Sequence, residues 1–65
     1  MMNGNASLKP NAIELHPVTD AWMQGDRYGA IVARWEDGTL LVRMDKSWKV
    51  YKVRPENVLR EFSRI

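Results

Sequence analysis

The fold is decided by residues 28–62, which read YGAIVARWEDGTLLVRMDKSWKVYKVRPENVLREF. Apolar and polar residues alternate there in three short runs, and a period of two is typical of strands with one buried face. The three runs are residues 28–35, 40–44 and 49–53. Asp37-Gly38, between the first two runs, is a type I′ hairpin signal, and residues 45–48 form a second tight turn that lacks glycine. The pattern predicts a three-stranded antiparallel meander.

The turns predict the pairing of the strands. A two-residue loop at Asp37-Gly38 would place Ile31 opposite Met44, Ala33 opposite Val42 and Trp35 opposite Leu40. A two-residue loop at Lys46-Ser47 would place Val42 opposite Tyr51 and Leu40 opposite Val53. Both hairpins then give one apolar face, and a slip of one residue would bury charges instead. The predicted core is Ile31, Ala33, Trp35, Leu40, Val42, Met44, Tyr51 and Val53.

The opposite face of this predicted sheet is basic. It carries Arg34, Arg43 and Lys52, with Arg54 beyond the last strand, and aliphatic residues lie between them. Arginine matches phosphate oxygens with a fork of donors, so this face is a candidate for nucleic-acid contact. The alternative is a solvated face whose long side chains cover the aliphatic residues beneath them.

The second turn adds an aromatic candidate. Trp48 and Lys49 lie at its tip, close to Lys46. An exposed indole beside lysines suits stacking on a base or on an aromatic partner. Packing over one end of the fold, or against Arg43 by a cation–π contact, is the alternative.

The segments outside the meander are less regular. Pro55 has no N–H to donate and restrains Arg54 before it, so residues 54–57 must leave the sheet, and Leu59–Phe62 is predicted to return as a closing strand. Ile13 and Leu15 alternate and suggest a short strand before or after Pro17, which stays open. Residues 19–23 fit one helical turn or a bend capped by Asp20, and Trp22 is expected to close one end of the core. Residues 1–12 are predicted to form a disordered arm and residues 13–65 the domain.

Composition narrows the function classes. The chain has 65 residues, which suits a single domain, and it has no cysteine and one histidine, so a disulfide or zinc site is not expected. Residues 21–65 hold nine Lys/Arg against six Asp/Glu, a net of +3, which favours acidic partners weakly. No apolar run is long enough for a membrane span and no signal peptide is visible, so a cytoplasmic location is expected. No acid–base pair or cofactor motif is present, and we expect no enzyme activity, no cofactor and no metal.

Three pieces of the chain resemble SH3-like barrels of the KOW, Tudor and ribosomal-protein kind. They are Gly29-Ala30-Ile31-Val32, Leu41-Val42-Arg43-Met44-Asp45 and Val53-Arg54-Pro55-Glu56-Asn57-Val58-Leu59. In those families a glycine opens a strand, two hairpins follow, and a short 3₁₀ turn precedes the last strand. The resemblance covers roughly residues 22–62 and implies an all-β, five-stranded antiparallel barrel of SH3-like type.

Two further resemblances concern shorter stretches. Residues 20–29, DAWMQGDRYG, look like the opening of small barrel proteins of phages and bacteria that have no settled activity. Residues 23–27 and the Val53-x-Pro55 corner are similar to the type II plasmid dihydrofolate reductases, whose tetramer pore is lined by Val-Gln-Ile-Tyr. Here Lys52 replaces the glutamine and Arg54 the tyrosine, and both substitutions count against reductase activity.

The sequence therefore predicts a non-catalytic binding module. The first hypothesis is contact with nucleic acid or a ribonucleoprotein through the basic face. The predicted site residues are Arg34, Arg43, Trp48, Lys49, Lys52 and Arg54. The alternative is a protein partner or self-association into a homo-oligomer, which includes a phage-derived modulator of a host protein.

Overall fold

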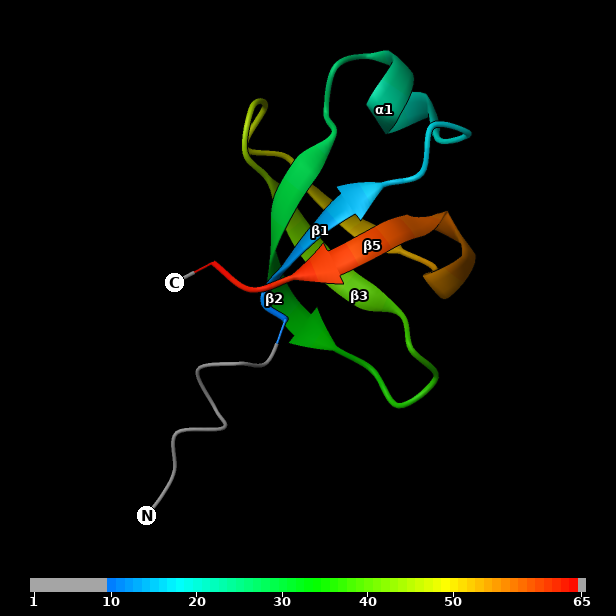
Figure 1. Cartoon of the computed structure of the whole chain (residues 1–65), viewed down its shortest axis with the longest axis vertical. Helices are drawn as coiled ribbons and strands as arrows, with labels where there is room; N and C mark the ends of the chain where they lie inside the picture. Colours follow the sequence, from blue (N-terminus) through cyan, green and yellow to red (C-terminus); the bar gives the residue numbers. More distant parts are fainter. Residues whose placement is uncertain (1–9, 65) are drawn as a thin grey trace.

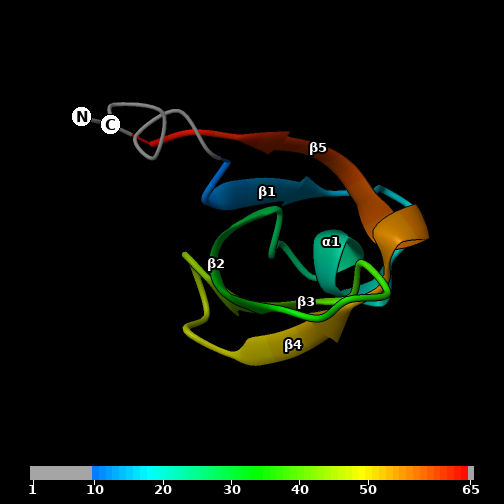
Figure 2. The same cartoon turned by 90° about the horizontal axis from the view of Figure 1, so that it is seen from below.

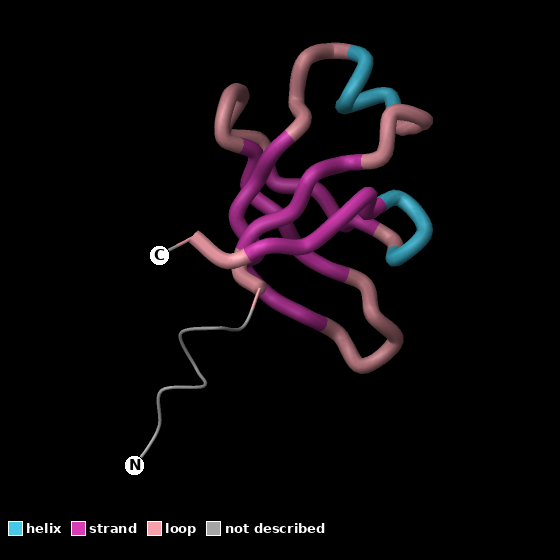
Figure 3. The backbone as a smooth tube through the Cα atoms, viewed as in Figure 1, coloured by secondary structure: helices cyan, strands magenta, loops and turns pink. Residues whose placement is uncertain are grey.

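The computed structural model describes residues 10–64, and within them five antiparallel strands form one sheet (Figure 1). The elements in chain order are β1 (Ala12–Leu15), α1 (Asp20–Met23), β2 (Tyr28–Arg34), β3 (Leu40–Met44), β4 (Val50–Val53), the 3₁₀ turn η2 (Pro55–Asn57) and β5 (Val58–Phe62). Helical residues are confined to two single turns between strands (Figure 3). The predicted mostly-β class is confirmed, as are the 3₁₀ turn at Pro55 and the strand that follows it.

The strands form one sheet in the order β4-β3-β2-β1-β5. Figure 2 shows that this sheet curls on itself, with β1 and β5 on one side, β3 and β4 on the other, and β2 curving between them. Among residues 10–64 the hydrogen-bonded order ends at β4 on one side and at β5 on the other. The interior between the two sides holds the core.

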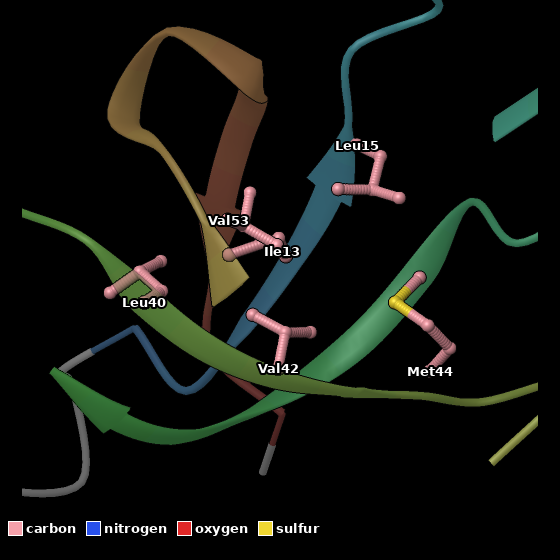
Figure 4. Packing of buried hydrophobic residues seen from close by; sticks show 6 residues of the cluster. All are labelled: Ile13, Leu15, Leu40, Val42, Met44 and Val53. Atoms are coloured by element: carbon pink, nitrogen blue, oxygen red, sulfur yellow. The ribbon is translucent and has the colours of Figure 1, made fainter. Parts of the chain in front are cut away.

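The core is a cluster of aliphatic side chains from β1, β3 and β4. Figure 4 shows these side chains converging between the strands. They are Ile13, Leu15, Leu40, Val42, Met44 and Val53, all almost fully buried. Ala21, Trp22, Ile31, Tyr51 and Val58 pack against them while remaining partly exposed. The alternating residues of β3 thus face the core as predicted, and β1 supplies three buried residues, Ala12, Ile13 and Leu15, that the predicted core lacked.

The close approach of β2 to β3 explains why position 29 is a glycine. A Cβ built at Gly29 would lie 2.5 Å from Cγ1 of Val42 and 2.8 Å from the carbonyl oxygen of Arg43. Real Cβ atoms do not come this close, so a larger residue would force the two strands apart. Gly29 therefore lets β2 press onto the core where the sheet curls.

The second hairpin follows the predicted register. Leu40 pairs with Val53 and Val42 with Tyr51. The Met44 N–H donates to the Lys49 carbonyl at 2.8 Å, so the loop has four residues, 45–48, instead of the predicted two at Lys46-Ser47. The pairing is unchanged because both loops are centred on the same residues. The Trp48 N–H donates to the Met44 carbonyl at 3.1 Å, and Trp48 has a φ of 66°.

The predicted register of the first hairpin is wrong, because its loop has three residues. The Trp35 N–H donates to the Thr39 carbonyl at 2.9 Å, which closes the loop around residues 36–38, and Gly38 has a φ of 92°. A left-handed residue in the third position is the usual way to close such a loop. Arg34 therefore pairs with Leu40, and Ala33 with Leu41.

A bulge then moves the register once more. Ile31 pairs with Val42, so Val32 is the extra residue on β2. Two shifts of one residue cancel in their effect on side-chain direction, and Ile31 therefore still faces the core as predicted. Between the two shifts the faces are exchanged. Ala33 and Trp35, which were predicted to be core residues, are exposed instead.

The ends of the described chain are held to the sheet. The Asn11 N–H donates to the Phe62 carbonyl at 3.1 Å, and the Ile31 N–H donates to the Asn11 carbonyl at 2.8 Å. Asn11 and Ala12 thus belong to the sheet rather than to the predicted arm of residues 1–12, and residues 1–9 lie outside the described residues.

The segment between β1 and β2 differs from expectation in two details. The open question of the first strand is answered, because β1 ends at Leu15, before Pro17. The helical turn α1 is capped by Thr19 rather than by Asp20, since the Trp22 N–H donates to Thr19 Oγ1 at 3.2 Å.

The loop after α1 is tied to the second hairpin by a buried carboxylate. Asp26 is buried and accepts hydrogen bonds from the Ser47 N–H at 3.2 Å and from Ser47 Oγ at 2.7 Å. This contact holds the four-residue loop, and Trp48 within it, against the body of the sheet.

Candidate functional site

Basic and aromatic side chains meet on the outside of β3 and β4. The buried residues of β3 point inward, so Leu41 and Arg43 point outward, and their partners across the ladder are Lys52 and Val50. The two hairpin loops add an indole at each end of this surface. We call it the outer face, and its members are Trp35, Leu41, Arg43, Trp48, Val50 and Lys52.

Trp48 lies beside Arg43 at one end of the outer face. The Arg43 guanidinium carbon is 4.9 Å from the centre of the Trp48 ring, and 68% of Trp48 is exposed. The indole thus packs against Arg43, as one of the two interpretations proposed, without closing over the core. Its left-handed backbone costs roughly 1–2 kcal/mol for a residue other than glycine. The backbone at Trp48 is therefore strained although the ring is exposed to solvent and not packed in the core.

Trp35 occupies the other end of the outer face. The Lys52 ammonium nitrogen is 5.3 Å from the ring centre, and 44% of Trp35 is exposed. Trp35 was predicted to be a core residue because a two-residue loop would turn its side chain inward. The adjacent apolar pair Ile31-Val32, which interrupts the alternation of β2, is the sequence signal that could have revealed a bulge.

A concavity opens beside the Trp35 ring. It has a volume of about 220 Å³ and is lined by Trp35, Asp37, Thr39, Lys52 and Arg54. The Thr39 N–H donates to Asp37 Oδ1 at 2.9 Å. Hydrogen bonds from Thr39, followed by the nearby charge of Arg54, hold the pKa of Asp37 below its ordinary value. The concavity thus combines an aromatic ring, two cations and one carboxylate.

Arg34 does not share this surface, although the sequence placed it there. It pairs with Leu40 and therefore points to the other face of the sheet. Its guanidinium donates to the Pro10 carbonyl at 2.7 Å and forms an ion pair with Glu61 at 3.1 Å. The shift caused by the three-residue loop exchanges Arg34 and Trp35, so the outer face gains an indole and loses a guanidinium.

Lys49 is also separate from the outer face. Lys49 lies opposite Met44 in the ladder, and the Met44 side chain is buried. Lys49 is therefore on the inner side of the sheet, but it is exposed because the sheet ends there. Of the predicted site residues, the structure brings together Arg43, Trp48 and Lys52, with Arg54 at the adjoining concavity.

The cations of the outer face, Arg43 and Lys52, have no ion-pair partner among the described residues. Within residues 10–64, Arg34, Arg60 and Arg64 form ion pairs with Glu61, Glu14 and Asp45, respectively. Neither Arg43 nor Lys52 forms an ion pair with any residue of the same part of the chain. Their charges are therefore available to an anionic partner.

The described residues contain neither a metal-binding cluster nor a membrane-spanning helix. Between Pro10 and Arg64, no group of three or more His, Cys, Asp or Glu side chains is placed to hold a metal ion. No helix within that range is long and apolar enough to cross a membrane. Comparisons with family models, with curated proteins and with solved structures found no match to this chain.

Proposed function

We propose that this chain is a non-catalytic binding module that contacts nucleic acid through the outer face. We also propose that its sheet is an SH3-like barrel, an architecture supported by the strand order β4-β3-β2-β1-β5 and by the 3₁₀ turn before β5. The proposal rests on residues that lie together on one surface rather than on similarity to a known protein.

One observation carries the proposal: two exposed indoles each lie beside a cation that has no ion pair within the described residues. Trp35 lies beside Lys52 and Trp48 beside Arg43. Bases stack on indoles whatever their sequence, while phosphates attract arginine and lysine. A surface with both features suits a ligand that alternates flat rings with negative charges.

The expected affinity depends on salt. If Arg43, Lys52 and Arg54 each neutralise one phosphate of a single strand, log K should fall with log salt concentration with a slope of about −2. Contacts by the indoles are not screened in this way, so part of the affinity should persist at physiological salt.

The test measures binding of a fluorescein-labelled oligonucleotide by anisotropy, at about 20 mM and about 150 mM salt. Arg43→Gln and Arg34→Gln are a matched pair, because each removes one guanidinium from a strand. Arg43 lies in β3 and Arg34 in β2. We expect Arg43→Gln to weaken binding and Arg34→Gln to leave it nearly unchanged, because Arg34 points to the other face. Arg43→Glu should weaken binding further, since it places a negative charge opposite the phosphates.

Two results would refute the proposal. One is the absence of binding by single- and double-stranded oligonucleotides even at low salt. The other is an equal loss in the two matched variants, which would mean that diffuse charge rather than the outer face attracts the ligand. Amide spectra of both variants should show that the fold is retained.

Self-association is the second candidate, and exposed aliphatic residues favour it. Val50 is 52% exposed on the outer face and Val32 is 56% exposed at the bulge. A homo-oligomer would cover them, and β4 lies at one end of the hydrogen-bonded order of the described residues. Sedimentation at increasing concentration tests this, with a mass above 7.6 kDa expected for an oligomer. Val50→Lys should then restore the monomer.

A further inference from the structure

We propose that the partner is single-stranded nucleic acid and that the concavity beside Trp35 holds one of its nucleotides. In this arrangement the base stacks on the Trp35 indole, and its phosphate lies between Lys52 and Arg54. The inference rests on the proposed function and goes beyond it, because it names the type of strand and a site for a single unit of it.

The ring of Trp35 is available for stacking. Its indole is outside the core and nearly half exposed, and its present neighbour is the end of a flexible lysine. A base can replace the Lys52 ammonium on the ring, because this long side chain can turn toward the phosphate. Lys52 would then contact the Trp35 ring in the free protein and the phosphate in the complex.

The charges around the concavity give the nucleotide a direction. Lys52 and Arg54 are cationic, while Asp37 is held ionised by the Thr39 N–H. An ionised carboxylate only accepts hydrogen bonds and repels phosphate. The phosphate should therefore lie on the side of Lys52 and Arg54, and the amino groups of the base edge should turn toward Asp37.

The exposed indoles favour a single strand over a duplex. In a duplex both faces of each internal base are already covered by neighbouring bases, so an indole on a sheet has no free base to cover. In a single strand the bases can separate and stack on side chains. Trp48 lies beside Arg43, two residues along β3 from the Leu41 that pairs with Lys52, so a second base has a ring to stack on farther along the same face.

The test compares a labelled mixed-sequence single strand of about 12 nucleotides with the duplex of the same sequence. Both are titrated with the full chain and with Trp35→Ala. We expect Trp35→Ala to weaken single-strand binding at least about fivefold, which lies at the low end for loss of one stacked base. Duplex binding, which uses only the phosphates, should change by less than about twofold.

Three variants serve as controls. Trp35→Phe keeps a ring and should recover part of the single-strand affinity. Arg54→Gln should weaken single-strand binding and reduce its salt dependence, because it removes one phosphate contact. Trp48→Ala should weaken single-strand binding as well, and its effect should add to that of Trp35→Ala if two bases stack. Amide spectra would verify that each variant is folded.

The outcomes separate this inference from the proposed function. If neither strand type binds at low salt, the proposed function fails, and the inference fails with it. If both bind but Trp35→Ala lowers both affinities equally or neither, the nucleotide site is refuted while the phosphate-binding face stands. A duplex bound more tightly than the single strand would also refute the inference.

Discussion

The two hairpins of this protein share β3 but differ in regularity. The pairing of β2 with β3 shifts at a bulge, and the pairing of β3 with β4 is continuous. In the second hairpin, Val42 pairs with Tyr51 as predicted. In the first, the loop has one more residue than Asp37-Gly38 suggested, and Val32 forms a bulge four residues before it. The second hairpin thus keeps every side chain on its expected face, and the first exchanges Arg34 with Trp35.

The difference shows that an error of one residue in the length of a loop changes which side chains lie on the surface. Ile31 lies beyond both shifts and packs against the core as predicted, whereas Ala33 lies between them and is exposed instead of buried. Trp35 lies between the shifts and faces solvent, so the candidate binding surface depends on it entirely. Two compensating shifts therefore exchange the faces of the residues between them and leave the residues beyond them on their predicted face.

Among single substitutions, the largest expected effect is at Gly29, where β2 lies close to β3 in the first hairpin. Gly29→Ala should lower the free energy of unfolding by about 3 kcal/mol, because the added methyl group meets Val42 and the backbone of Arg43. Urea denaturation followed by tryptophan fluorescence measures it. Ala33→Val, at an exposed position of the same strand, is the control and should change stability by no more than about 0.5 kcal/mol. Equal effects would mean that the close approach is not what the glycine serves.

A smaller loss is expected at the loop of the first hairpin. Gly38→Ala should cost about 2 kcal/mol, because φ is 92° there and the new Cβ would lie 2.9 Å from Cγ of Pro55. Thermal unfolding gives the change. At Trp48, the left-handed residue of the second hairpin, replacement by alanine should cost less, since the native residue already bears the strain. The reverse order would contradict this comparison of the two turns.

Deleting the bulge tests whether the loop alone sets the faces. Without Val32, Ile31 still pairs with Val42 and Ala33 with Leu41, now as consecutive pairs. We expect the deletion to cost about 1–2 kcal/mol through lost local twist, and to leave Ile31 inside and Trp35 outside. Contacts between Ile31 and Val42 in nuclear Overhauser spectra provide the measurement. Deletion of Arg43, which is paired on both sides, should instead unfold the chain.

Relieving the strained turn should separate stability from binding. Trp48→Gly removes roughly 1–2 kcal/mol of left-handed strain and adds about 0.5–1 kcal/mol of backbone entropy cost. The free energy of unfolding should therefore stay level or rise by up to about 1.5 kcal/mol, while oligonucleotide affinity falls. Denaturation and anisotropy on the same sample measure the two quantities. A destabilised variant would show that the contact with Arg43 outweighs the strain.

The smallest effect concerns acid. The pKa of Asp37 is lowered in the folded chain by its hydrogen bonds with Thr39, so the contribution of this group is present above its ordinary pKa of 3.8. It should be lost as the pH falls below that value toward the folded pKa. Because Asp37 is fully exposed, the step should be small. Asp37→Asn keeps a capping oxygen and should flatten the stability profile below pH 4, and an unchanged profile would assign the acid dependence to other carboxylates.

The sequence predicted the parts of the fold that repeat one signal several times. The alternation of β3 identified a strand with a buried face, and Pro55 identified the point where the chain leaves the sheet before the last strand. The 3₁₀ turn at this point was implied by the resemblance alone. Asp37-Gly38 was ambiguous, because a glycine with positive φ closes a three-residue loop as well as a two-residue one. Both cations of the outer face, Arg43 and Lys52, were predicted to lie on it because they belong to the hairpin with the expected register. Trp35 was missed because the loop length was wrong, and β1 was left undecided because four residues carry too short a pattern.

The joining of the two ends of the described chain has a mechanical consequence. Asn11 enters and Arg64 leaves at the same end of the antiparallel pair β1 and β5, and the Arg64 N–H donates to Asn11 Oδ1 at 2.7 Å. A force applied between these ends would open the β1–β5 ladder one hydrogen bond at a time rather than shearing all of them together. The domain should therefore peel apart under a weak pull, even though the core that stabilises it at rest lies largely between β1, β3 and β4.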